Sequence, residues 1–147
     1  MLDHIVIPTD GTELSARAAA FAVQLAKKMA AKVTAVTVTT PADDMMVGEV
    51  QIIRNIEEYE ERMSASARAM LDVIGKLAAE ASVPCEKLHV RSASPWYGIL
   101  EAAKSHKADM IVMASHGRRG LSGMLIGSET QKVVNHSPIP VTIYREH

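Results

Sequence analysis

Residues 4–39 read HIVIPTDGTELSARAAAFAVQLAKKMAAKVTAVTVT. The first six form a short apolar run that ends at a proline and an Asp-Gly pair, which is typical of a buried strand followed by a turn. Apolar residues then recur at steps of three and four, which predicts an amphipathic helix. Residues 32–39 are rich in β-branched side chains and predict a second strand. The predicted inner face of the helix consists of Leu14, Ala18, Phe21, Leu25 and Met29.

The rest of the chain continues the alternation of strands and helices. A polar loop over residues 40–48 is followed by helical spacing from residue 52 to residue 81. Further along, we expect strands at 85–90, 109–114 and 141–144, and helices that start at Ser94-Pro95 and at Ser128. Strands that alternate with helices predict a parallel sheet with helices on both faces. We therefore expect an α/β fold, a single doubly wound domain over residues 1–147 with a five-stranded parallel sheet.

Composition excludes several classes of protein. Sixteen basic and 17 acidic residues give a formal charge of −1, so we expect neither a nucleic-acid nor a membrane partner. One Trp, three Tyr and one Phe are too few for a base-stacking surface. Cys85 has no second cysteine to pair with, and no Cys/His spacing resembles a metal site. The first residues do not resemble a targeting peptide and no apolar run approaches 18 residues, so we expect a cytoplasmic protein.

Two segments follow strongly apolar strands, at residues 8–12 and 113–130. In doubly wound sheets, ligands bind beyond the carboxyl ends of such strands. The second segment holds four glycines within 11 residues and leads into a hydroxyl-bearing helix start. Glycine lets backbone approach a ligand closely, and a helix N-terminus favours phosphate. These glycines are Gly117, Gly120, Gly123 and Gly127.

Named catalytic and phosphate-binding motifs are absent. Neither Gly-x-Gly-x-x-Gly nor Gly-x4-Gly-Lys-[Ser/Thr] occurs, and Ser122 is not in a Gly-x-Ser-x-Gly motif. We therefore assign no catalytic residue.

The pattern Ala114-x2-Gly117-x9-Gly127-Ser128-x-Thr130 does match a known signature. Together with Ile-Pro-Thr-Asp-Gly at residues 7–11 and a final Ser-Pro-Ile-Pro-Val-Thr-Ile-Tyr strand, it resembles the universal stress protein family over the whole chain. The resemblance implies the strand order 3-2-1-4-5 and a homodimer formed along the last strand. It also implies ATP binding. Mg²⁺ or Mn²⁺ is a candidate companion ion, because Mg²⁺ often takes only one or two protein ligands together with phosphates.

The resemblance also implies a site residue by residue. Pro8, Thr9 and Asp10 would lie beside the nucleoside, with Asp10 facing the ribose, and Val38 would line the adenine pocket. Met113 and Gly117 would flank the sugar and the phosphates, which Gly127, Ser128 and Thr130 would contact. Ala114 departs from the family pattern, which has glycine there. Its methyl group either crowds a ligand or is tolerated because the backbone dihedrals are ordinary.

Each residue also has a plainer interpretation. Asp10 and Ser128 are candidates for helix caps, and Val38 and Met113 for core packing. His116 is more typical of a surface loop than of a general base. Arg118 and Arg119 could neutralise phosphates, but adjacent arginines in a polar loop are more often solvated. Functionally, we expect an ATP-binding stress-response module with at most slow ATP hydrolysis or autophosphorylation, acting on unknown protein partners. The alternative is a nucleotide-free structural dimer that acts through such partners.

Overall fold

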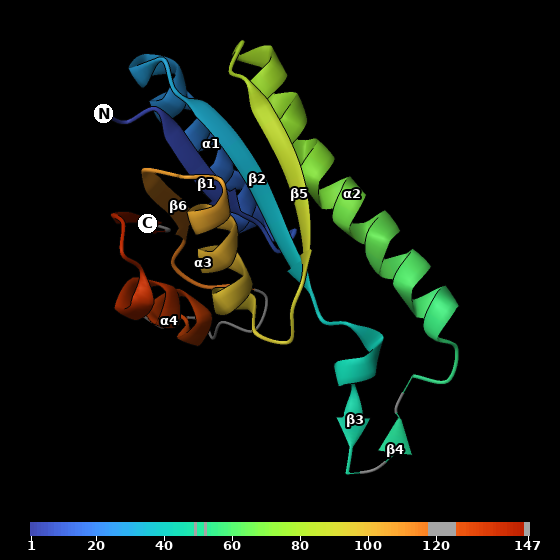
Figure 1. Cartoon of the computed structure of the whole chain (residues 1–147). Helices are drawn as coiled ribbons and strands as arrows, with labels where there is room; N and C mark the ends of the chain where they lie inside the picture. The colour runs from blue at the N-terminus through green and yellow to red at the C-terminus, as the bar shows by residue number, and fades with distance from the viewer. Residues whose placement is uncertain (49, 52, 118–125, 146–147) are drawn as a thin grey trace.

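The computed structural model describes residues 1–48, 50–51, 53–117 and 126–145. Their order of elements follows the predicted alternation of strands and helices, with a short hairpin added (Figure 1). The elements are β1 (His4–Pro8), α1 (Glu13–Met29), β2 (Lys32–Thr39), a 3-10 turn (Ala42–Asp44), β3 (Met46–Val47), β4 (Val50–Gln51), α2 (Ile56–Glu80), β5 (Cys85–Arg91), α3 (Pro95–Ser105), β6 (Met110–Ala114), α4 (Ser128–His136) and β7 (Val141–Tyr144).

The described residues form a five-stranded parallel sheet in the order β5-β2-β1-β6-β7. Counted along the chain, this is the order 3-2-1-4-5, which confirms the fold that the sequence and the family resemblance predicted. Helices α1 and α2 pack on one face of the sheet, and α3 and α4 pack together on the other (Figure 1). The chain runs from β1 to β2 on one side and later returns to β6 on the other, so β1 and β6 flank the switch point.

Strand β1 is buried along its whole length, from His4 to Pro8. Ile5 and Ile7 pack in the core beneath α1 and α2, whereas Val6 packs in the core beneath α3. Successive strand residues point to opposite faces, so a strand covered on both faces needs apolar residues at every position. This explains why Ile5, Val6 and Ile7 form an unbroken apolar run.

Helix α1 buries small residues rather than its large ones. Its inner face includes Ala18, Ala22 and Ala26, which are fully buried, whereas Phe21 is 44% exposed. The prediction that Phe21 and Met29 face the core was wrong, because alanines let the helix approach the sheet closely. The Phe21 ring lies beside Tyr144 of β7 instead, with ring centroids 5.9 Å apart.

The segment between β2 and α2 differs from the predicted loop and helix start. It contains the 3-10 turn and the antiparallel β3–β4 hairpin. Helix α2 begins at Ile56, four residues later than expected, because the Asn55 side chain caps it and accepts a hydrogen bond from Glu58 N at 3.0 Å. Residue 52, the predicted start, lies outside the described residues. Among the described helices, none combines the length and apolar character needed to cross a membrane.

A buried histidine joins the amino-terminal ends of the strands. His4 is 4% exposed, its Nδ1 donates to the carbonyl oxygen of His106 at 2.9 Å, and its Nε2 accepts from the Thr34 hydroxyl at 2.7 Å. Burial lowers the pKa of His4 below its ordinary value, although the hydrogen bond to His106 opposes this shift. The native structure therefore holds this imidazole neutral.

This shift predicts a pH dependence of folding. The unfolded chain takes up a proton on residue 4 at a higher pH than the native protein does, so the free energy of unfolding falls as pH drops through the unfolded pKa of about 6.5. Between pH 7.5 and 5.5, urea unfolding of the wild type should lose stability more steeply than that of His4→Gln. The difference has a limit of about 1.4 kcal/mol per pH unit for one proton. Equal slopes for the two proteins would contradict the prediction.

Candidate functional site

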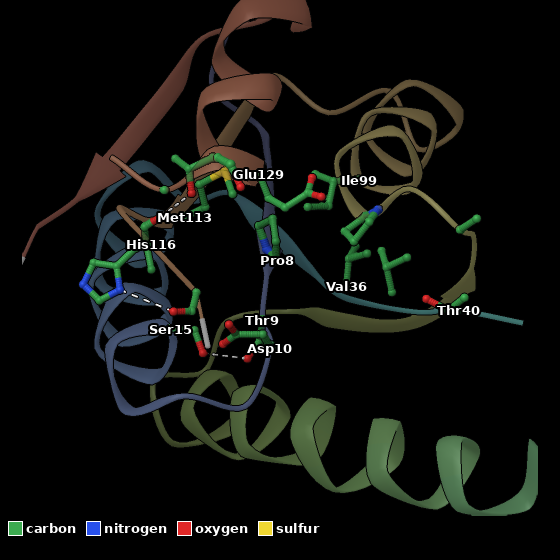
Figure 2. Close-up of a pocket in the computed structure, with 18 residues that line it drawn as sticks. Pro8, Thr9, Asp10, Ser15, Val36, Thr40, Ile99, Met113, His116 and Glu129 are labelled. Atoms are coloured by element: carbon green, nitrogen blue, oxygen red, sulfur yellow. Dashed lines mark hydrogen bonds between the residues drawn. The ribbon is translucent and has the colours of Figure 1, made fainter. Parts of the chain in front are cut away.

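A cavity of about 510 Å³ opens at the carboxyl ends of β1, β2 and β6. Its wall comes from these strand ends, from the start of α3 and from the start of α4 (Figure 2). The cavity thus lies beside the switch point between β1 and β6, where parallel α/β sheets bind ligands. Its volume falls within the usual range for small-molecule sites.

The structure brings all ten predicted site residues to this one cavity. They are Pro8, Thr9, Asp10, Val38, Met113, Ala114, Gly117, Gly127, Ser128 and Thr130. Sequence reasoning missed Val36, which lies two residues before Val38 on the same strand face and could have been found from that period. It also missed several residues for which it had no signal: Ser15, Thr40, Ala93, Pro95, Ile99 and Glu129.

Local hydrogen bonds fix the loop after β1. Thr9 N donates to Val36 O at 2.8 Å, which ties this loop to β2. Asp10 Oδ1 accepts from both the backbone N and the hydroxyl of Thr12, at 3.0 and 2.6 Å. Thr12 in turn caps α1 by accepting a hydrogen bond from Ser15 N at 3.2 Å. Asp10 therefore orients the capping residue and does not cap α1 itself.

The loops after β1 and β6 touch at Gly117. A Cβ atom placed on Gly117 would lie 2.6 Å from Asp10 Oδ2, well inside van der Waals contact. Only glycine fits here while the carboxylate keeps its position. Gly117 is therefore explained by the Asp10 side chain, whether or not a ligand is bound.

The start of α4 forms the opposite wall of the cavity. Gly127 is the N-cap residue, so the prediction that Ser128 caps this helix was wrong, and Ser128 is its first helical residue. Gly127 N donates to Ser115 O at 2.7 Å, and the Thr130 hydroxyl donates to Ala114 O at 3.0 Å. These bonds attach the first turn of α4 to the end of β6. Glycine has no side chain to cap this turn, whose N–H groups carry partial positive charge.

The methyl group of Ala114 points away from α3 and α4. It packs with Leu14 and Ala18 of α1, on the other face of the sheet. Ala114 is a strand residue and is not among the residues with positive φ. The departure from the family's glycine is therefore tolerated by the backbone.

The side of the cavity nearest β2 and α3 is apolar. It is lined by Val36 and Val38 of β2 and by Pro95 and Ile99 of α3, and the two valines and Ile99 belong to one packed cluster. Gly98 lets the two elements approach, because a Cβ there would lie 3.1 Å from Val38 Cγ2. Helix α3 begins at Pro95 with Ser94 as its N-cap residue, as the sequence predicted, although the Ser94 side chain makes no capping bond.

Polar and charged groups complete the wall. Asp10 and Glu129 are its carboxylates, and the half-buried His116 lies beside Gly117. Within the described ranges, no cluster of three or more His, Cys, Asp or Glu could hold a metal ion by itself. Arg118, Arg119, Gly120, Ser122 and Gly123 lie outside the described residues.

The model of the universal stress protein family matches residues 1–145. The chain belongs to the universal stress protein family. Universal stress protein MJ0531 of Methanocaldococcus jannaschii is 33% identical over 144 residues, which cover 97% of this chain and 81% of that protein. A universal stress protein of Thermus aquaticus is 31% identical over 148 residues, 99% of this chain and 100% of its own length.

Solved structures agree with the fold. The protein MJ0577 superposes with a TM-score of 0.83 at 23% identity, covering 100% of this chain and 98% of its own. A universal stress protein in complex with cAMP has a TM-score of 0.73 at 26% identity, covering 99% and 98%. The Archaeoglobus fulgidus universal stress protein in complex with dAMP has a TM-score of 0.62 at 20% identity, covering 97% and 98%.

The contact between Gly117 and Asp10 predicts a thermodynamic coupling. Gly117→Ala should cost about 1–2 kcal/mol of unfolding free energy, because the new methyl group displaces the Asp10 carboxylate. In the Asp10→Ala background this obstacle is gone, so the same substitution should cost about 0.5 kcal/mol or less. Denaturant unfolding of the two single variants and the double variant measures the coupling. An equal cost in both backgrounds would mean that Asp10 is not the obstacle.

Proposed function

We propose that this universal stress protein binds ATP in the cavity and acts as a stress-response regulatory module. The observation that carries the proposal is the single cavity that combines an apolar side, the Asp10 carboxylate and the N-terminus of α4. A nucleotide needs these three environments in turn, for its base, its ribose and its phosphates.

The chemistry of each part suggests one orientation of the ligand. The adenine would lie against the apolar side of the cavity, which Val36, Val38 and Ile99 line. Asp10 accepts hydrogen bonds, as the ribose hydroxyls require. The phosphates would bind at residues 127–130, where the helix dipole and backbone N–H groups favour negative charge.

The comparisons support a nucleotide as the ligand of this cavity. The choice of ATP among nucleotides rests on the sequence pattern. The relative solved with cAMP shares 26% of its residues and the fold with this chain. We choose ATP because the residues at 114–130 resemble the pattern that holds ATP in the nucleotide-binding branch of the family.

Such a module would act by changing which protein partners it binds. Any hydrolysis of ATP would be slow. Both carboxylates of the described cavity wall already accept hydrogen bonds, Asp10 from Thr12 and Glu129 from Trp96 N, which disfavours activation of a water molecule. The proposal includes a cytoplasmic location, which rests on the sequence alone.

ATP binding can be tested directly. Nucleotide extracted from the purified protein should be ATP by chromatography, and calorimetry should show ATP binding to the wild type. Asp10→Ala should weaken that binding about 10-fold or more, since it removes hydrogen bonds to a charged acceptor. Asp43→Ala removes the same charge at an exposed site and serves as the control.

The opposite result would favour the alternative function. An empty extract and no heat signal with millimolar ATP would overturn the proposal and favour a nucleotide-free dimer. Turnover well above about one per second would instead indicate a dedicated enzyme.

We also propose a homodimer that forms along β7. This strand lies at the edge of the described sheet, and its residues are only half-buried in the single chain. An exposed strand edge is a ready surface for pairing with a second chain. Sedimentation equilibrium at micromolar concentrations should give twice the 15.9 kDa chain mass. A monomer throughout that range would contradict the proposal.

A further inference from the structure

One end of the cavity is bounded by the segment that follows β2. Thr40 lines the cavity there, and Figure 2 shows it at the opposite end of the lining from His116. The paired register of β2 with β5 ends at Thr39, so contacts outside the sheet must hold residues 40–42 in place. The apolar side of the cavity, where the base of a nucleotide is proposed to lie, depends on the position of this segment.

The Tyr59 side chain of α2 supplies the first of these contacts. It is 8% exposed, and its hydroxyl donates to Thr40 O at 2.7 Å, the usual length for a hydroxyl donor. The Met45 thioether lies 3.3 Å from the same hydroxyl, but sulfur is the weaker acceptor. Tyr59 is not among the described lining residues, so it fixes the wall of the cavity through the backbone of Thr40.

The neighbouring Glu60 supplies the second contact. Ala42 is fully buried, and Pro41 before it gives the 3-10 turn no side-chain cap. Instead, Glu60 Oε1 accepts from Ala42 N at 3.0 Å, and the same oxygen accepts from Arg91 Nη2 at the end of β5. The bond from Ala42 N, together with Arg91, holds the pKa of Glu60 below its ordinary value, so this carboxylate is ionised at neutral pH.

The ion pair between Glu60 and Arg91 also involves the segment that follows β5. Ser92 N, directly after Arg91, donates to Thr39 O at 2.9 Å. Ala93, the next residue, lines the cavity. Two adjacent side chains of α2 therefore hold both the segment after β2 and the segment after β5, and each segment contributes to the wall.

We propose that Tyr59 and Glu60 are positioning residues that set the affinity of the cavity for the nucleoside part of its ligand. The inference rests on the proposed function and adds that the base end of the cavity is held from α2. A base needs a wall in one fixed position, because packing contacts weaken steeply when surfaces separate by a fraction of an ångström. The proposed phosphate end is held by separate hydrogen bonds between α4 and β6, so it should be independent of α2.

Calorimetric titrations of the full chain with adenosine, AMP, ATP and inorganic tripolyphosphate test the proposal. Tyr59→Phe removes only the hydroxyl, and Glu60→Ala removes the carboxylate. Tyr97→Phe removes a hydroxyl from a side chain of α3 that is 51% exposed, and Glu61→Ala removes the same charge at the adjacent exposed residue; these two variants are the controls. Circular dichroism verifies that each variant is folded before it is titrated.

Tyr59→Phe and Glu60→Ala should weaken adenosine, AMP and ATP by a common factor of about 3- to 10-fold, because these ligands share the nucleoside. The affinity for tripolyphosphate should stay within about twofold of the wild type. Glu60→Gln should recover most of the loss, since its amide oxygen can still accept from Ala42 N. Both controls should match the wild type with every ligand. Ser128→Ala, at the proposed phosphate end, should weaken ATP more than adenosine.

The negative outcomes are distinguishable. If adenosine binds equally well to the wild type, Tyr59→Phe and Glu60→Ala, the positioning role is overturned while nucleotide binding stands. If these two variants weaken tripolyphosphate as much as adenosine, the side chains support the fold in general, and the positioning role is again overturned. If the wild type binds neither adenosine, AMP nor ATP, the proposed function fails and the positioning role fails with it.

Discussion

The burial of β1 on both faces is the constraint on which the rest of the structure depends. Ile5 and Ile7 fill one core and Val6 the other, so helices must cover both sides of the central strand. With β2 and β6 on its two edges, β1 also becomes the strand beside which the chain changes direction. The loop that follows it, with Thr9 and Asp10, consequently lies at the carboxyl ends of the strands, where the cavity opens.

The cavity results from contacts between loops that are far apart in the sequence. Gly117 touches the Asp10 carboxylate, while Gly127 and Thr130 are hydrogen-bonded to the end of β6. These contacts hold the carboxylate and the N-terminus of α4 on two sides of one space. Glu129 adds a second negative charge there and connects α4 to α3 through Trp96. The described wall therefore combines the N-terminus of α4 with two carboxylates.

Much of the architecture could be predicted because local periodicity and burial agree. The strand at residues 32–39 and the strand at 141–144 have the bounds that the sequence indicated. Errors arose where a tertiary contact or a capping side chain decided the outcome. Phe21 has the right spacing for the core, but close packing of alanines leaves it beside Tyr144. The start of α2 depends on the Asn55 cap, which apolar spacing does not reveal.

The sequence by itself determined the alternation of strands and helices and the two segments that follow the strongly apolar strands, because apolar periodicity and the spacing of the glycines are local properties. The order of strands and the ten residues at the cavity were implied by the resemblance to the universal stress protein family. Only the tertiary structure decided how those residues meet. The Ala114 methyl group packs against α1, and a Cβ at position 117 would displace the Asp10 carboxylate. The tertiary structure alone also placed Glu129 in the cavity wall. The direction of a side chain depends on the elements packed around it, and these lie far away along the chain.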